Sequence, residues 1–323
     1  MLLAAGFGQR MVPLTLRRAK PTLPFLNRSL LLRQLDYLER ARIDEVVVNT
    51  HHRPESIRDL LRQASLGPAP ENGPFTCGRL TVHLSREENR LGTAGGLRHA
   101  AHHFRSSGTF LCLNSDIVSE IDLSAAVRAH REGGQLATLV LAPPVDGYTP
   151  VAYRQGRMVA FGRAAAAGTG VPVNWGTFTG IHVLEPAVLE RLPDGPSGFL
   201  PALYLPMLAA GEPLGAHLGS GSWVEVGTAR RYLDTQVQAV KGKILLAPGC
   251  RVAAEARLEQ GCILGRRVTV GPGARLTRVV LLDRVSIGEN ARIRDSIVGP
   301  GTSIPPGERV SRCLVEEDRR VPF

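Results

Sequence analysis

The residues best suited to chemistry lie at the amino terminus, in the segment LAAGFGQRMVPLTLRRAKPTLP (residues 3–24). Gly6 and Gly8 permit backbone conformations that a Cβ atom would forbid, and they let backbone N–H groups approach a phosphate closely. Arg10 and Lys20 add the cations that phosphoryl oxygens require. The motif G-x-x-x-x-G-K-[ST] is absent, and Met11 replaces the last glycine of G-x-G-x-x-G. The segment therefore predicts a nucleoside triphosphate site of another kind.

Lysine is rare in this chain, which gives Lys20 added weight. Among 39 lysine and arginine residues, the lysines are Lys20, Lys241 and Lys243. An ammonium binds phosphate as a compact point charge, whereas arginine binds through a planar fork. A lone early lysine in a chain that otherwise uses arginine therefore indicates a need for the point charge.

Several motifs together resemble those of the sugar-1-phosphate nucleotidyltransferases. The glycine-rich turn supplies LAAGFGQR, and the others follow in the family's order as far as about residue 240. They are PLT (13–15), AKP (19–21), VNTHH (48–52), LGTAGGL (91–97), FLCLNSD (110–116), FTGIHVL (178–184) and WVEVGT (223–228). The LGTAGG loop and a repetitive carboxyl-terminal segment make the chain most similar in appearance to mannose-1-phosphate guanylyltransferases and bacterial NDP-sugar synthases.

This resemblance implies transfer of a nucleotidyl group from a nucleoside triphosphate, with GTP favoured, to a hexose 1-phosphate, with mannose 1-phosphate favoured. The products would be an NDP-sugar and pyrophosphate. Two alternatives stay open: a glucose-1-phosphate thymidylyl- or uridylyltransferase, and a non-catalytic subunit that senses nucleotide sugars. Arg10, Lys20 and Asp116 favour catalysis, because a sensor has no need for leaving-group chemistry.

The catalytic needs of such a transfer select the remaining charged residues. Both reactants are anionic, so charge neutralisation and positioning dominate, and a protein nucleophile is unnecessary. We expect Arg10 to bind the leaving β- and γ-phosphates and Lys20 to stabilise the α-phosphate. A divalent ion, Mg²⁺ or Mn²⁺, must bridge triphosphate oxygens, and magnesium prefers one or two carboxylates plus waters. Asp116 and Glu225 are the candidate metal ligands, with a helix cap and a surface ion pair as their alternative roles.

The nucleotide site should continue from the first turn into the segment LSREENRLGTAGG (84–96). Glu87 occupies the place where related thymidylyl and uridylyl enzymes often carry glutamine, and a carboxylate accepts from two donors, as the N1–H and N2–H edge of guanine requires. A solvated acidic turn is the alternative. The main chain from Gly92 to Gly95 should pass close to the base and ribose. The expected nucleotide-binding residues are Leu3, Ala4, Ala5, Gly6, Gly8, Arg10, Glu87, Gly92 and Thr93.

The sugar side departs most from the family pattern. Relatives often show Y-G-x-V before a hairpin and E-K-P after it, where this chain has YTPV (148–151) and FGRA (161–164). Arg163 thus replaces a lysine that holds the sugar phosphate, and Gly162 replaces a sugar-binding glutamate. The resemblance places the sugar phosphate near Arg163, Asn174, Thr179 and Gly180.

Length and composition are those of an enzyme rather than a nucleic-acid or membrane protein. The 323 residues are 43% hydrophobic and could form two domains. The net charge is +10, yet the basic residues are scattered and aromatic residues make up only 5%. No apolar run approaches the ~18 residues that span a bilayer. Five cysteines without C-x-x-C spacing indicate free thiols and a cytoplasmic location.

The first domain, residues 1–240, alternates strand and helix patterns. This alternation predicts an α/β fold, a Rossmann-like and mostly parallel sheet flanked by helices, with ligands outside the carboxyl ends of the strands. Residues 65–78 and 164–173 should be loops. Relatives have two or three more strand residues before Met1, so the first strand should be short or the start misassigned. The expected strands are 43–50, 79–85, 108–114 and 136–142, and the expected helices are 29–41, 55–61, 95–104 and 122–132.

The second domain, residues 244–323, has a period of six. A hexapeptide period is typical of a parallel β-helix, and the resemblance makes it left-handed with three hexads per coil. Its coils should mediate a homo-oligomer, and an acyltransferase is disfavoured because they contain no histidine to act as a base. The repeating apolar residues are Leu246, Val252, Leu258, Leu264, Val270, Leu276 and Leu282, then Ile287 and Ile293, then Val298 and Ile304.

Overall fold

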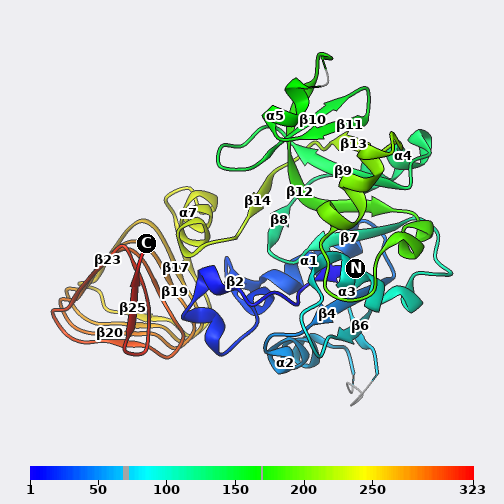
Figure 1. The fold of residues 1–323 in the computed structure, drawn as a ribbon. Coiled ribbons are helices and arrows are strands. Elements are labelled where there is room, and N and C mark those ends of the chain that lie inside the picture. Colours follow the sequence, from blue (N-terminus) through cyan, green and yellow to red (C-terminus); the bar gives the residue numbers. More distant parts are fainter. Residues whose placement is uncertain (68–72, 169) are drawn as a thin grey trace. The chain divides into compact units, whose positions relative to one another are not determined.

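The computed structural model describes residues 1–67, 73–168 and 170–323 (Figure 1). These residues form two compact units. The first combines Met1–Gly6 with Arg33–Glu225, and the second combines Phe7–Leu32 with Val226–Phe323. The units are not identical to the expected segments 1–240 and 244–323, because residues 7–32 and the helix that precedes the repeats group with the carboxyl-terminal unit.

The first unit is built on a ten-stranded sheet whose centre is parallel. Strand β1 (Leu2–Leu3) lies between β4 (Glu45–Thr50) and β7 (Phe110–Asn114), parallel to both, and β4 is parallel to β6 (Leu80–Arg86). These strands confirm three of the expected ranges. β4 and β7 are mainly buried, as expected for strands covered on both faces, whereas β6 alternates buried and half-buried residues.

The sheet is mixed beyond β7, where most pairs are antiparallel and β13 (Gly215–Leu218) is parallel to β9 (Ala137–Ala142), so the expectation of a mostly parallel sheet is not met in this half. The long strand β12 (Asn174–Leu184) pairs antiparallel with both β7 and β9. The sequence does not predict this strand, because no helix pattern flanks its apolar residues. The other strands of this sheet are β5 (Phe75–Cys77), β10 (Pro150–Arg154) and β11 (Arg157–Phe161), and a separate pair joins β8 (Ile117–Ser119) to β14 (Trp223–Glu225).

The expected helices are present with small shifts in their ends. The clearest local signal is at α4, where the side chain of Asp122 accepts from the backbone N–H of Ala125 at 3.0 Å and Gly134 ends the helix with a φ of 62°. The expected loops at 65–78 and 164–173 are wrong where they contain β5 and α5, and residues 68–72 and 169 lie outside the described residues. The α-helices are α1 (Leu30–Arg40), α2 (Pro54–Ala64), α3 (Gly92–His99), α4 (Leu123–Gly133), α5 (Arg163–Ala167), α6 (Leu205–Ala209) and α7 (Ala229–Ala239).

The carboxyl-terminal repeats form stacked parallel coils, drawn from yellow to red in Figure 1. Leu246 is paired with Leu264, and Leu258 with Leu276, an offset of three hexads. Where the phase of the repeat slips, Leu276 pairs with Ile293 one residue early. The repeat residues are buried from Leu264 onward, and the architecture is that of a parallel β-helix.

The strands of this unit divide between two sheets and a hairpin near the amino terminus. The first coil is uncovered at Ile244 and Leu246, which are 46% and 49% exposed. The strands are β2 (Pro24–Phe25), β3 (Arg28–Ser29), β15 (Ile244–Leu246), β16 (Arg251–Val252), β17 (Arg257–Leu264), β18 (Thr269–Val270), β19 (Arg275–Leu281), β20 (Ser286–Ile287), β21 (Arg292–Val298), β22 (Ser303–Ile304), β23 (Arg309–Ser311), β24 (Cys313–Glu316) and β25 (Arg319–Pro322).

Within residues 1–67, 73–168 and 170–323, no helix combines the length and apolarity needed to cross a bilayer.

A buried histidine should make the first unit sensitive to acid. His182 on β12 contacts Phe199 and is hydrogen-bonded to Tyr204, and burial lowers its pKa to about 3. The unfolded chain takes up this proton near pH 6.5, so stability is lost as the pH falls below that value, by about 2 kcal/mol between pH 7 and pH 5. His182→Gln should lose this contribution, measured by denaturant unfolding followed through Trp175 and Trp223, which both lie in this unit. An unchanged pH dependence in the variant would contradict this assignment.

Candidate active site

The carboxyl ends of the parallel strands collect several of the predicted site residues. Leu3 ends β1 in register with Asn49 on β4 and with Asn114 on β7. Ala4, Ala5 and Gly6 therefore follow β1 at the same edge at which Asp116 follows β7. Glu87 follows β6, whose Arg86 pairs with Thr50 of β4. This edge is where ligands bind to open α/β sheets.

The two glycines of the first turn differ in what they require. Gly8 has a φ of 63°, and a Cβ built there would lie 2.8 Å from Cγ2 of Thr15 and 3.3 Å from Cβ of Lys20. Gly6 is not left-handed, and a Cβ there would meet nothing within 4 Å. The expectation of a forbidden conformation is thus confirmed for Gly8 and wrong for Gly6, where the open space instead leaves room for a ligand.

Arg10 and Lys20 lie in the second unit, on a segment of short turns. Arg10 is exposed, in the 3-10 turn Gln9–Met11, whereas Lys20 is buried at the start of the turn Lys20–Thr22. The hydroxyl of Thr15 donates to the carbonyl of Gly8 at 2.9 Å and closes the loop between them. Lys20 is therefore held beside Gly8, where a compact cation fits.

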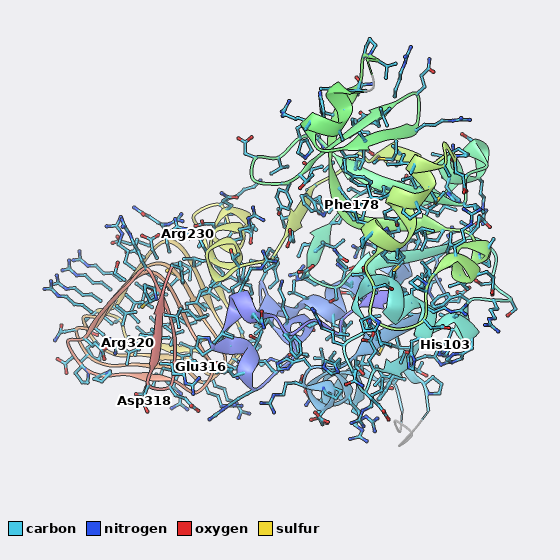
Figure 2. All side chains as sticks on the ribbon, in the orientation of Figure 1. His103, Phe178, Arg230, Glu316, Asp318 and Arg320 are labelled. Atoms are coloured by element: carbon cyan, nitrogen blue, oxygen red, sulfur yellow. The ribbon has the colours of Figure 1, made fainter. Side chains whose placement is uncertain are left out.

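Residues 7–32, the amino-terminal segment of the second unit, are attached to α7 and the β-helix by polar contacts. Arg18 donates to Glu316 of β24 at 2.7 Å, and Glu316 is labelled in Figure 2. The buried side chain of Gln236 on α7 accepts from the N–H of Leu26 at 2.8 Å. Asn27 donates to the carbonyl of Leu264 at 3.0 Å. The β-helix therefore supports the segment that carries both phosphate-binding candidates.

The two candidate metal ligands are brought together by the pairing of β8 and β14. Glu225 ends β14 opposite Ile117, and Asp116 directly precedes Ile117. Both carboxylates are half-buried. Magnesium binds one or two carboxylates with additional waters, and the binding of a metal ion by Asp116 and Glu225 stays a prediction. Among the described residues, no cluster of three histidine, cysteine or acidic side chains offers an alternative site.

Ser115, which stands where relatives usually have glycine, is accommodated without strain. Its φ is not left-handed, and its hydroxyl donates to the carbonyl of Leu3 at 2.7 Å. Ser115 thus ties β7 to β1 immediately before Asp116.

The carboxylate of Glu87 is engaged by protein donors. It is 2% exposed, and one oxygen accepts from Nδ2 of Asn49 at 2.6 Å while the other accepts from the N–H of Leu91 at 2.9 Å. Asn49 was not singled out by sequence reasoning, although a polar residue at the end of the apolar run VVVNT is a usable signal.

The glycine-rich segment that begins α3 packs against residues 195–199. Gly92 has a φ of 76°, and a Cβ there would lie 2.5 Å from the carbonyl oxygen of Ser197. That carbonyl accepts from the N–H groups of Ala94 and Gly95, and the hydroxyl of Thr93 accepts from Phe199. These glycines therefore serve close backbone packing within the protein.

The predicted sugar-phosphate residues are spread along β12. Thr179 is fully buried and donates to the carbonyl of Val140 at 2.7 Å, and Gly180 has a φ of 79° against the side chain of Asn114. Asn174 is exposed at the start of the strand, about 16 Å away along five residues. The guanidinium of Arg163 lies 5.1 Å above the ring of Trp175, next to Asn174. Arg163 and Asn174 are thus associated with one end of β12, and Thr179 and Gly180 with a bulge farther along.

Gly162 takes a backbone conformation that suits glycine. It has a φ of 84°, a conformation that side chains rarely adopt, and its N–H donates to the carbonyl of Pro150 beside the β10–β11 hairpin. A glutamate at this position of this chain would therefore be strained.

The fold described above contains a nucleotidyl transferase domain. Residues 1–150 match the family described as nucleotidyl transferase, and residues 240–321 match the GMPPB C-terminal domain. The chain thus combines a nucleotidyl transferase domain with a GMPPB C-terminal domain, and the resemblance to sugar-1-phosphate nucleotidyltransferases seen in its motifs is confirmed. Members of this family generally use divalent metal ions.

Its relatives narrow the class further. The probable mannose-1-phosphate guanylyltransferase 3 of Oryza sativa subsp. japonica is 28% identical over 98% of this chain and 90% of its own length. The mannose-1-phosphate guanylyltransferase 1 of Arabidopsis thaliana shows the same identity and coverage. That of Mycobacterium tuberculosis is 28% identical over 89% of this chain and 80% of its own length.

Removal of one carboxylate tests the proposed metal site. Asp116→Asn should lower turnover by about 100-fold or more, because a catalytic metal contributes several kcal/mol of charge stabilisation. Pyrophosphate release with added Mg²⁺ measures this, and Asp318→Asn in the exposed turn after β24 is the matched control. Full turnover in Asp116→Asn with an intact fold would remove Asp116 from the site.

Proposed function

We propose that this enzyme transfers the guanylyl group of GTP to mannose 1-phosphate, giving GDP-mannose and pyrophosphate. The observation that carries this proposal is the similarity, over nearly the whole chain, to proteins named mannose-1-phosphate guanylyltransferase. The adjacent positions of Asp116 and Glu225 at the edge of the sheet support a catalytic role.

The mechanism proposed is an in-line displacement at the α-phosphorus. An oxygen of the sugar phosphate attacks, the bond from the α-phosphorus to the bridging oxygen breaks, and pyrophosphate leaves. Lys20 would stabilise charge on the α-phosphate, and Arg10 would bind the leaving β- and γ-phosphates. Asp116 and Glu225 fit a divalent ion, Mg²⁺ or Mn²⁺, which when bound neutralises triphosphate oxygens.

The acceptor side is proposed to bind the sugar phosphate through Arg163. Its guanidinium is exposed above Trp175, and arginine binds phosphate through paired donors. Because Gly162 offers no carboxylate for a sugar hydroxyl, we expect weak discrimination among hexose 1-phosphates.

Three further properties complete the proposal. The β-helix is left-handed, as the resemblance implies, and it joins copies of the chain into a homo-oligomer. The exposed first-coil residues Ile244, Leu246 and Val252 support the oligomer, since an open coil end leaves apolar surface uncovered. The enzyme acts in the cytoplasm, where its five free cysteines remain reduced.

A substrate screen tests the proposal directly. Purified protein with Mg²⁺ is offered GTP, UTP, dTTP or ATP against mannose, glucose and galactose 1-phosphates, and pyrophosphate release is followed. We expect the highest kcat/KM with GTP and measurable transfer to more than one hexose 1-phosphate. Preference for UTP or dTTP would reject the guanylyl assignment, and sharp selection of one sugar would reject the weak discrimination.

The substitution Lys20→Arg tests whether the cation at position 20 must be an ammonium group. Lys20 is 8% exposed and packed beside Gly8, so a longer planar guanidinium cannot place its charge at the same point. We expect kcat to fall about tenfold or more, while the KM for GTP changes less. Arg17→Lys in the same segment is the matched control, because Arg17 is exposed and pairs with Glu317. Equal activity of Lys20→Arg and wild type would show that the ammonium is not required.

A further inference from the structure

A buried chain of three hydrogen bonds joins the first turn to the LGTAGG segment, all within the first unit. The N–H of Ala4 donates to Oδ1 of Asn49 at 2.6 Å, and Nδ2 of Asn49 donates to Glu87 at 2.6 Å. The second oxygen of Glu87 accepts from the N–H of Leu91 at 2.9 Å. Asn49 and Glu87 are 1% and 2% exposed, so water does not compete for these bonds.

The direction of each bond is fixed by the groups at the ends of the chain. The backbone N–H of Ala4 and of Leu91 can only donate. Oδ1 of Asn49 must therefore face Ala4, which leaves its NH₂ group to face Glu87. Both oxygens of Glu87 then act as acceptors, so this chain of bonds requires one amide and one carboxylate in the pair, which Asn49 and Glu87 supply.

The space around this pair is closed by a glycine. A Cβ built at Gly96 would lie 2.6 Å from Nδ2 of Asn49 and 2.6 Å from Oε1 of Glu87. The third glycine of LGTAGG thus lets α3 approach the bond between the two side chains, and it leaves no room for a base at that contact.

We propose that Asn49 and Glu87 are a positioning pair, which sets the separation between the nucleotide-binding turn at Ala4–Gly6 and the segment that begins at Leu91. This inference deepens the proposed nucleotidyl transfer and rests on it. Glu87 acts on the nucleotide through the two backbone segments it aligns, and the base is read by other groups. The pair should therefore affect turnover with every nucleoside triphosphate to a similar extent.

Each single substitution breaks one bond in a defined way. In Glu87→Gln, the amide NH₂ must face either Asn49 or the N–H of Leu91, and a donor then meets a donor. In Asn49→Asp, two carboxylates face each other across 2.6 Å. We expect kcat/KM to fall on the order of tenfold or more in each variant. Glu88→Gln, at the exposed neighbouring residue, is the matched control and should retain wild-type activity.

The double variant Asn49→Asp with Glu87→Gln restores all three bonds. The carboxylate now at position 49 would accept from Ala4 and from the NH₂ group now at position 87. The carbonyl oxygen of that new amide would accept from Leu91. One bond runs in the reverse direction, and one carboxylate remains in the pair. We expect the double variant to recover kcat/KM to within about threefold of wild type, although each substitution alone is deleterious.

Three measurements decide the outcome: kcat and KM with GTP and UTP, nucleotide Kd by calorimetry, and unfolding followed by Trp175 and Trp223. Recovery in the double variant with an unchanged GTP-to-UTP ratio supports the positioning pair. A ratio altered in Glu87→Gln and still altered in the double variant would overturn it and make Glu87 a base contact. Wild-type activity of folded single variants would also overturn it. Wild-type protein that binds nucleotide without turnover would reject the proposed function. In that case the positioning role is tested by comparing the nucleotide Kd values of the single and double variants with that of the wild type.

Discussion

The attachment of residues 7–32 to the β-helix is the constraint on which the candidate phosphate-binding residues depend. Arg10 and Lys20 lie near the amino terminus in sequence, yet their segment packs with α7 and the repeats. Arg18 and Glu316 form the most enclosed ion pair of this attachment, with side chains 21% and 7% exposed. Loss of either partner would leave a poorly solvated charge, which costs far more than loss of an exposed pair.

Helix α7 reinforces the same attachment from the other side. Gln236 is fully buried; its carbonyl oxygen accepts from Leu26, and its NH₂ group donates to the carbonyl of Tyr232. The hydroxyl of Tyr232 donates to the carbonyl of Pro24. Gln236 thus satisfies the N–H of Leu26, which lies outside any helix or strand. The β-helix and α7 in this way support the conformation of the segment that carries the candidate catalytic residue Lys20.

The local elements could be predicted from the sequence, whereas their grouping could not. The strands β4, β6, β7 and β9 are short apolar runs, and the caps of α4 are visible as Asp122 and Gly134. The hexapeptide period identified the β-helix because it repeats over many successive hexads. The antiparallel insertion of β12 and the transfer of residues 7–32 to the second unit depend on long-range pairing, which no local pattern encodes.

In the candidate site, too, some features could be predicted from the sequence and others depend on the fold. The conformation of Gly8 followed from its place in a glycine-rich turn, and the adjacency of Asp116 and Glu225 emerged only when β14 paired with β8. Glu87 illustrates the limit of prediction from residue type. A carboxylate can accept from the N1–H and N2–H groups of guanine, yet the two oxygens of Glu87 accept from Asn49 of β4 and from Leu91. Residue type identifies what a side chain can bind, and only the fold identifies which donors reach it first.

The repeat places arginines that are regularly spaced in the sequence next to one another on the surface of the β-helix. Arg257, Arg275, Arg292 and Arg309 are 17 or 18 residues apart, and register places them opposite one another on successive coils. They form an exposed column of like charges about 4.8 Å apart, tolerated because water and salt screen exposed groups. Basic residues that are scattered along the chain are therefore gathered on one face of the β-helix. Scatter in the sequence excludes a linear basic tract, and it does not exclude a basic face.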